Sequence, residues 1–192
     1  ITLKFEWWIQ LAASDINLTQ NGCTASDKNY LAKLRWATGN LKSTGSTNYI
    51  WAPSQTETGY YYTWYSTYTG NKTTNNTDPC SKLNTAYYGT GWRTPSENDY
   101  IPLSRCTDKV LTNGGMWFMN KSIGIFLLAA GTIGNGGGSA TSNPNYSTAK
   151  TGQYWTSKKD GENRGISFTF NPRSTFMFSD YQATGIEVRC VK

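Results

Sequence analysis

Residues 91–106 read GWRTPSENDYIPLSRC, and this stretch carries a strong local signal for a helix. Thr94 can act as the N-cap residue, and the proline after it suits the first helical position, where a missing N–H costs nothing. Glu97, three residues after Thr94, completes a capping box. Tyr100 and Leu103 recur at helical spacing. The sequence therefore predicts a short amphipathic helix that lays one apolar face against a sheet.

The composition outside this stretch favours strands and loops over helical bundles. Charged residues make up only 16% of the chain, whereas glycine (19) and tyrosine (13) are abundant. At 192 residues the chain suits one domain. We expect an α+β domain over residues 1–192, in which residues 1–30 form an N-terminal strand and loop extension and residues 31–192 form the core.

Periodicity gives a coarse map of the elements. Residues Ile1–Leu11 alternate between apolar and polar, which is typical of a half-buried strand. Residues Ser14–Asn29 are polar and are expected to form a loop, and Leu31–Leu41 is strand-like. Asp78 can cap a short helix that starts at Pro79. Further strands are expected at 114–120, 124–130, 153–157, 165–170, 175–178 and 185–191, with exposed or mobile loops at 70–78 and 131–152.

Residues 48–68 are dense in tryptophan and tyrosine. Aromatic rings of this density suit either a sugar-stacking platform or the core of a fold with little regular structure. We assign Trp51 and Trp64 to the core and leave the tyrosines open between the two interpretations.

The residue inventory argues against catalysis and cofactor binding. The chain has no histidine, which removes the usual catalytic triads and metalloprotease helices. No carboxylate pair has the spacing of a dyad, and Asp160 and Glu162 lie beside Lys158 and Lys159, where surface ion pairing is expected. We therefore expect no enzyme activity, no metal and no cofactor.

Charge and hydropathy limit the partners. The net charge is +6, but the lysines and arginines are scattered, so nucleic-acid binding is not expected. The longest apolar run, Ile123–Ala130, is strand-sized and far shorter than the roughly 18–20 residues of a membrane-spanning helix. No direct membrane insertion is expected. Because Ile1 follows no signal peptide in this sequence, we expect a mature or trimmed form.

Four cysteines, Cys23, Cys80, Cys106 and Cys190, are present without CxxC spacing. Without histidine, a zinc site would need all four widely separated thiolates. Disulfide bonds in an oxidising compartment are the better interpretation.

The last strands offer a candidate binding surface. If Met177 points to the core, alternation places Phe176 and Phe178 on the outer face, although either phenylalanine could instead belong to the core. On the preceding strand, Ile166, Phe168 and Phe170 are expected inside and every second residue outside. Aromatic, arginine and small polar residues are the mixture that adaptable binding surfaces use. The predicted ligand-binding residues are Lys158, Lys159, Asn163, Arg164, Ser167, Thr169, Arg173, Phe176, Phe178, Asp180 and Tyr181.

An ordered set of motifs resembles the C-type lectin fold in its bacterial form. The shared landmarks are the GWRTPSE stretch, an apolar strand ending in Ala-Ala-Gly, a Tyr-Trp-Thr-Ser strand and a final Val-Arg-Cys-Val, at 91–97, 124–131, 154–157 and 188–191. This form includes Fibrobacter-type surface domains, formylglycine-generating-enzyme-like domains and variable proteins of diversity-generating retroelements. The resemblance covers residues 34–192 and departs at Pro102, which is expected to kink or shorten the helix.

The resemblance implies a disulfide-stapled fold of short helices on small antiparallel sheets with long ordered loops. It implies that Cys80 joins Cys190, which leaves Cys23 and Cys106 for the second bond. The calcium motifs of sugar-binding lectins are missing, and residues 143–145 (NPN) are only a faint echo that lacks an acidic ligand.

In the retroelement variable proteins, adenine-directed mutagenesis diversifies solvent-facing positions of the last strands and turns. The resemblance therefore implies a non-catalytic module whose region 131–185 binds a protein or other macromolecular ligand on another cell or surface. The expected location is extracytoplasmic, on a bacterial surface or alternatively on a phage virion. A non-diversified adhesin or pilus-tip domain that binds glycan through residues 48–68 is the alternative. A formylglycine-generating type of enzyme is a distant third, because Cys190 is the only cysteine after Cys106 and is assigned to a disulfide.

Overall fold

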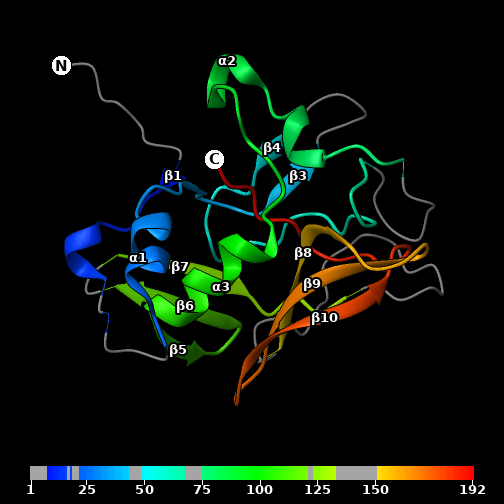
Figure 1. The fold of residues 1–192 in the computed structure, drawn as a ribbon. Helices are drawn as coiled ribbons and strands as arrows, with labels where there is room; N and C mark the ends of the chain where they lie inside the picture. Colours follow the sequence, from blue (N-terminus) through cyan, green and yellow to red (C-terminus); the bar gives the residue numbers. More distant parts are fainter. Residues whose placement is uncertain are drawn as a thin grey trace.

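A computed structural model describes residues 8–16, 18, 22–43, 49–67, 75–120, 123–132 and 151–192. It combines helices with small antiparallel sheets (Figure 1). The helices are η1 (Ala13–Asp15), α1 (Ala25–Leu31), η2 (Pro79–Lys82), α2 (Thr85–Tyr88) and α3 (Glu97–Cys106). The strands are β1 (Trp8–Ile9), β2 (Trp36–Ala37), β3 (Leu41–Ser43), β4 (Tyr49–Trp51), β5 (Asp108–Thr112), β6 (Gly115–Asn120), β7 (Ile123–Leu128), β8 (Gly152–Lys159), β9 (Arg164–Phe170) and β10 (Thr175–Tyr181).

Helix α3 forms where the sequence predicts it but starts two residues later. Ser96 is the N-cap residue and forms a capping box with Asp99. The expected cap, Thr94, instead donates its hydroxyl to Asp78 at 2.7 Å, and its backbone N–H also points at that carboxylate. The helix continues through Pro102 to Cys106, so the proline does not shorten it.

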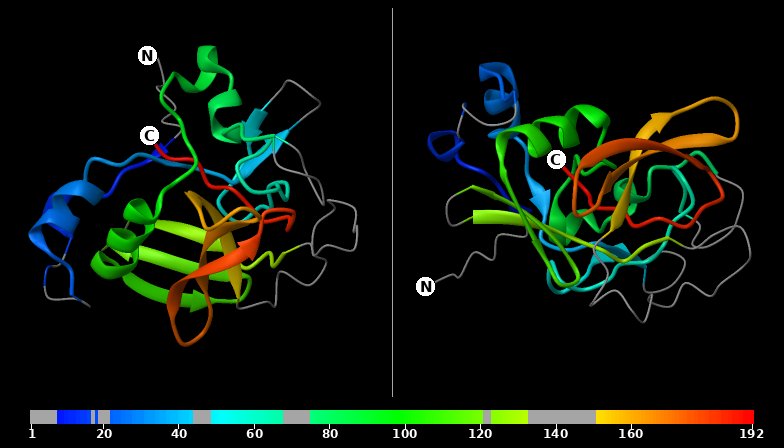
Figure 2. Two further views of the ribbon diagram at one scale, coloured as in Figure 1. Left: turned by 45° about the vertical axis from the view of Figure 1, so that its right-hand side comes forward. Right: turned by 90° about the horizontal axis from the view of Figure 1, so that it is seen from below.

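Helix α3 lies beside α1 and in front of the β5–β6–β7 sheet (Figures 1 and 2). Tyr100 is fully buried and stacks on Phe168 of β9 with ring centroids 4.5 Å apart. The first core cluster contains Leu11, Ile16, Cys23, Leu31, Leu34, Trp36, Tyr100, Leu103, Cys106, Met116, Phe118, Ile125, Leu127, Ala129, Tyr154, Phe168, Phe170 and Val191. The helix therefore buries its apolar face as predicted, and strand β5 joins the two strands predicted at 114–120 and 124–130.

The other three-stranded sheet has the order β10–β9–β8 and contains the strands predicted at 153–157, 165–170 and 175–178. Each strand is longer than its prediction. The β9–β10 hairpin projects from one end of the molecule (Figures 1 and 2). Strand β10 has β9 as its only strand partner among the described residues, so it is an edge strand.

A second core cluster lies among β3, β4, β8 and the C-terminal segment. Its members are Ala37, Leu41, Tyr49, Trp51, Tyr62, Trp64, Cys80, Leu83, Trp92, Trp155, Ile186, Val188 and Cys190. The assignment of Trp51 and Trp64 to the core is confirmed. The strand predicted at 185–191 is wrong as a continuous element, because this segment makes only isolated bridges, such as those of Ile186 with Tyr62 and of Val191 with Trp36.

The N-terminal prediction requires a correction. The stretch predicted as a loop contains helix α1, which begins with a capping box between Thr24 and Asp27. Its last residue, Leu31, is fully buried in the first core cluster. Spacing alone did not reveal this helix because its exposed faces are polar. The strand-like stretch that follows is divided into β2 and β3.

Both expected disulfides are present. Cys80 bonds Cys190 with Cα atoms 5.7 Å apart, and Cys23 bonds Cys106 with Cα atoms 5.0 Å apart. The short helix predicted at Pro79 is also confirmed, with Asp78 as its cap. The predictions for residues 1–7, for the loops around 70–74 and 133–150, and for the NPN stretch at 143–145 lie outside the described residues.

Candidate functional site

The exposed aromatic pair predicted on the last hairpin is present on β10. Phe176 is 40% exposed and Phe178 is 47% exposed. Their rings meet edge to face, with centroids 6.4 Å apart and planes at 81°. Between them, Met177 is half-buried and packs against the first core cluster, so the predicted register of this strand is confirmed. The two rings are therefore displayed by the strand.

The prediction for β9 is half right. Phe168 and Phe170 are buried in the first core cluster as expected, but Ser167 and Thr169 are buried too. Ser167 shares a sheet face with Trp155 of β8, which belongs to the second core cluster. The second core cluster therefore covers this face over β8 and β9. Over β10 the same face carries the exposed rings of Phe176 and Phe178.

Gly165 shows how closely the second cluster covers this face. A Cβ atom added to Gly165 would lie only 2.2 Å from Cδ1 of Trp64. Gly165 and Ser167 are two residues apart on one strand, so both point to the same side of the sheet. Ser167 and Thr169 therefore cannot serve as solvent-facing contacts in the way that the sequence suggested.

The buried hydroxyls belong to a small polar cluster under the aromatic pair. The Ser167 hydroxyl donates to Oδ2 of Asp180 at 2.6 Å, and Nε2 of Gln153 approaches the same oxygen at 3.2 Å. Burial raises the pKa of Asp180 above its ordinary value, although the Ser167 hydrogen bond and the charge of Arg164 oppose that rise. Asp180 is thus held by the sheet and is only partly available to a ligand.

Half-buried Arg164 and exposed Tyr181 form a second surface feature. The guanidinium carbon of Arg164 lies 4.4 Å from the centre of the Tyr181 ring, and Tyr181 is 55% exposed. Nε and Nη2 of Arg164 donate to the side chain and to the carbonyl of Ser179, each at 2.8 Å. These bonds hold the β9 arginine against the neighbouring strand β10 and fix the position of its charge.

The register separates these features into two groups. Phe178 pairs with Ser167, whereas Tyr181 pairs with Arg164 and Met177 with Phe168, so the two sets point to opposite sides of the sheet. The predicted ligand-binding residues therefore do not lie on one face of the sheet. Among the remaining predicted residues, Lys159, Asn163 and Arg173 are exposed. Lys158 is also exposed but pairs with Glu97 at 2.7 Å.

Hollows formed by described residues lie on either side of helix α3. One, of about 210 Å³, lies between α3 and β10 and is lined by Ile101, Ser104, Arg105, Phe168, Thr175, Phe176 and Met177. We call it the α3–β10 hollow. The other, of about 350 Å³, lies between α1 and α3 and is lined by Ser26, Asp27, Tyr30, Asn98, Ile101, Pro102 and Arg105. Sequence reasoning missed both, because they depend on how separate elements pack.

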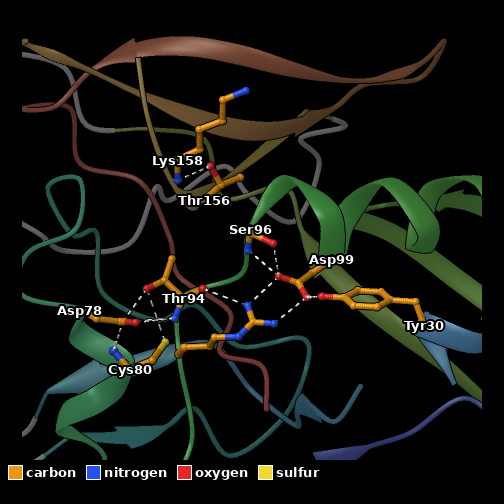
Figure 3. A network of polar contacts seen from close by, with 9 residues as sticks. Tyr30, Asp78, Cys80, Thr94, Ser96, Asp99, Thr156 and Lys158 are labelled. Carbon is orange, nitrogen blue, oxygen red and sulfur yellow. Dashed lines mark hydrogen bonds and ion pairs between the residues drawn. The ribbon is translucent and has the colours of Figure 1, made fainter. Parts of the chain in front are cut away.

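A polar network fixes the start of α3 (Figure 3). The Asp99 carboxylate is fully buried and accepts hydrogen bonds from Arg93, Ser96 and the Tyr30 hydroxyl. Burial alone would raise the pKa of Asp99, but the bonds from Arg93 and Ser96 outweigh it and leave the pKa below its ordinary value. This network joins α1 to α3, the two helices that line the second of these hollows.

The C-terminal segment buries an unexpected pair of charges. Glu187 and Arg189 are fully buried, and both contact the side chain of Asn40 at 2.8 Å. Ile186, Val188 and Cys190, which alternate with them along the chain, are buried as well, so both faces of this segment are enclosed. The charges satisfy backbone groups inside the fold, including the N–H of Gly59 and the carbonyl of Ala37, and we assign them a structural role.

The aromatic stretch at 48–68 contributes mainly to packing. Tyr49, Tyr61 and Tyr62 are buried, and Tyr60 and Tyr65 pack partly buried against the second core cluster. Tyr68 lies outside the described residues.

Within the described residues, no three histidine, cysteine, aspartate or glutamate side chains are grouped as they would be to hold a metal ion. Nor does this part of the chain include a helix with the length and apolar character needed to span a bilayer. Comparison of the chain with protein-family models, curated proteins and solved structures finds no match.

Proposed function

We propose that the chain is a non-catalytic module that binds a macromolecular ligand through β10 and its neighbouring turns. The observation that carries this proposal is the pair Phe176 and Phe178. Both are large apolar side chains exposed on β10, and Met177 between them packs against the first core cluster. Exposed apolar side chains gathered on one element are a feature of interaction sites. Tyr181, Arg164 and Arg173 add the residue types that supply most of the binding energy at protein interfaces.

We further propose the C-type lectin fold for this chain. The landmarks of the resemblance occupy coherent positions: GWRTPSE leads into α3, Tyr154–Ser157 lies on β8, and Val188–Val191 passes through the second core cluster. The bond between Cys80 and Cys190, which the resemblance implied, fits the same proposal. Two disulfides support an extracytoplasmic location, for which we propose a bacterial surface, with a phage virion as the alternative.

Within this fold, we propose a variable protein of a diversity-generating retroelement. The exposed positions of the last strands and turns hold phenylalanine, tyrosine, arginine, asparagine and lysine, between the packed residues Tyr154 and Val188. A rigid core with adaptable exposed side chains suits diversification, because surface substitutions usually change stability by no more than about 0.5 kcal/mol. The ligand is then a protein or another macromolecule on a different cell or surface.

The burial of most of the 48–68 aromatics weighs against the glycan-binding alternative. A direct test of the retroelement proposal is the coding DNA. A nearby template repeat should match the codons of residues 135–190 except at adenines. A coding region without such a repeat would remove this part of the proposal and leave a non-diversified binding module.

The binding proposal itself is tested by randomising the codons of Lys159, Asn163, Arg173, Phe176 and Phe178 in a display library. Most members should stay folded, and selection should yield variants that recognise different immobilised proteins. The control library randomises buried positions of the same strands, such as Phe168 and Phe170, and should yield few folded members. Equal loss of folding in both libraries would contradict the proposal.

A further inference from the structure

The exposed residues of the candidate site lie along the outer edge of β10, the edge that does not pair with β9. Phe176 and Phe178 lie on one side of this strand, and Met177 and Tyr181 lie on the other, according to the register with β9. A ligand that lay flat on either face would reach only one group. A strand placed along the edge would present alternate side chains to both.

The backbone of β10 has open hydrogen-bonding groups along this edge. Backbone bonds from Asn171 N to Ser174 O and from Gln182 N to Asn163 O lie at the two ends of the β9–β10 ladder. In an antiparallel ladder every second residue pair is hydrogen-bonded, so these two bonds fix which pairs between them are hydrogen-bonded. By alternation, Phe176, Phe178 and Asp180 direct their N–H and C=O groups to β9. Thr175, Met177, Ser179 and Tyr181 therefore direct theirs outward.

Part of the outward row is already occupied. The Ser179 carbonyl accepts from Arg164, and the Tyr181 carbonyl accepts from the Thr184 N–H. Among the residues that the structure describes, no bond reaches the N–H or C=O of Thr175 or Met177, or the N–H of Ser179, from this side. These groups form a continuous open segment at the hairpin end of β10.

Within the described part of the chain, this open segment lacks the protection that edge strands usually carry. Natural edges are blunted by charged side chains, by proline or by a covering element. Strand β5, another edge strand, follows that rule with exposed Asp108 and Lys109. Residues Thr175–Ser179 carry no charge and display two phenylalanine rings.

The α3–β10 hollow lies beside the same segment. Thr175, Phe176 and Met177 form its β10 side, and Ile101 and Arg105 form part of its α3 side. Its volume of about 210 Å³ and its mainly apolar lining suit an apolar side chain. A strand paired with Met177 would direct every second side chain toward this side of the sheet, where the hollow lies.

We propose that β10 binds an extended peptide segment of a partner protein by strand addition, with an apolar side chain of that segment in the α3–β10 hollow. This mode takes its affinity from backbone bonds and its specificity from pockets for alternate side chains. The inference deepens the proposed function and rests on it, because it assigns a ligand class to the same strand.

Charge identifies the partner segment further. Arginines stand at both ends of the edge. Arg173 and Arg105 are near Thr175, although Arg105 also lies 3.9 Å from the Asp27 carboxylate, and Arg164 lies beside Tyr181. The nearest carboxylate on the strand, Asp180, is bonded to Ser167. Opposite charges favour an apolar segment flanked by aspartate or glutamate. The same arginines, and the net charge of +6, oppose pairing with a second copy of this chain.

The experiment uses capped peptides matched to the seven residues of β10, in which threonine alternates with valine, leucine or phenylalanine between terminal glutamates. Amide hydrogen exchange of the whole chain is measured by NMR with and without peptide. Binding should slow exchange at Met177 and Ser179. Exchange at Phe176 and Phe178 should be slow before and after addition, because their amides already bond β9.

Peptide N-methylation separates strand addition from simple side-chain contact. N-methylation of two alternate nitrogens on the protein-facing edge should weaken binding about tenfold or more, because it removes backbone bonds. The same modification on the other edge serves as the matched control and should leave affinity within about threefold.

Variants of the chain provide an independent readout. Met177→Pro removes an outward N–H from an edge position that tolerates proline, and it should weaken peptide binding about tenfold. Met177→Ala is its matched control, since it also shortens the side chain that lines the hollow but keeps the N–H, and it should weaken binding less than Met177→Pro does. A melting curve of each variant verifies folding.

Several results would overturn the inference. They are equal effects of the two N-methylation patterns, unchanged exchange at Met177 and Ser179, failure of every peptide to bind at millimolar concentration, and protection of these amides by dimerisation of the chain alone. In each of these cases the library selection still decides the proposed function by itself, because it scores recognition through side chains and does not require strand pairing.

Discussion

Arg93 and Asp99 form a two-pronged ion pair at the start of α3. Nη1 of Arg93 lies 2.7 Å from Oδ2 of Asp99, and Nη2 lies 2.8 Å from Oδ1 (Figure 3). The same carboxylate accepts from the Ser96 backbone and from the Tyr30 hydroxyl. One buried side chain therefore ties the GWR turn, the first turn of α3 and helix α1 together, and the position of α3 depends on it.

Asp99→Asn should destabilise the fold by about 2–4 kcal/mol. The new side-chain NH2 group would face N–H donors of Arg93 or Ser96, and Arg93 would lose its negatively charged partner. Tyr30→Phe is the milder control and should cost about 1 kcal/mol, since only one hydrogen bond is lost. Urea unfolding of the variants gives both values. An effect of Asp99→Asn no larger than that of Tyr30→Phe would contradict this account.

The pH dependence of this pair has a defined sign. The pKa of Asp99 is lowered in the folded protein, so its contribution to stability is present above the ordinary value of 3.8. That contribution is lost as the pH falls through the folded pKa. Denaturant midpoints measured at several values below pH 4 should fall more steeply for the wild-type chain than for Asp99→Asn.

The side chains of Phe176 and Phe178 should contribute little to the free energy of unfolding. Replacing both with serine should change the free energy of unfolding by about 0.5 kcal/mol or less per site, because both rings are exposed. Phe168→Ser on the neighbouring strand should instead cost at least about 3 kcal/mol, because that ring is stacked on Tyr100. Thermal melts distinguish these outcomes. A large loss of stability in the double variant would mean that β10 buries these rings against a neighbour.

The cross-link between Cys80 and Cys190 should be a major source of stability. It closes a loop with a sequence separation of 110, for which the chain-entropy relation gives about 4–5 kcal/mol. Cys80→Ser with Cys190→Ser should therefore lower the free energy of unfolding by about that amount. Peptide mapping of unreduced protein should recover a fragment that joins the two positions. A free Cys190 thiol in the native protein would contradict the assignment.

The sequence was informative at several positions where a local rule decides the structure, although the capping box that begins α1 was missed. Alternation around Met177 correctly oriented Phe176 and Phe178, and the Asp-Pro pair at 78–79 marked a short helix. It failed where a second layer intervenes. Ser167 obeys the alternation of β9 but is buried, because the second core cluster covers that side of β8 and β9. Strand periodicity identifies a face and cannot tell whether that face meets water or another part of the chain.

The same limit explains the buried charges near the C-terminus. Glu187 and Arg189 occupy the alternate positions that a half-buried strand would give to solvent, and no local pattern distinguishes the two cases. The hollows beside α3 escaped prediction for a related reason. Ile101 and Thr175 line the same hollow only because α3 packs close to β10, and these two segments are far apart in the sequence.

Glu187 should make the protein more stable in mild acid than at neutral pH. Burial raises the pKa of this carboxyl to about 7, although bonds from Gly59 and Asn40 and the charge of Arg189 oppose the rise. A folded pKa above the ordinary value of 4.5 means that the folded state holds the proton more tightly. The contribution is therefore fully present below pH 4.5 and is lost as the pH rises through 7.

Chemical unfolding between pH 4.5 and 8 tests this prediction, since each unit of pKa difference corresponds to about 1.4 kcal/mol. Glu187→Gln is the matched variant, because it keeps the shape of the side chain and removes its titration. It should be less stable than the wild type, since its amide brings a second donor toward Gly59 or Asn40. Its stability should also vary less over this pH range. Identical pH profiles for the two proteins would show that Glu187 stays ionised throughout, held by Gly59, Asn40 and Arg189 against the cost of burial.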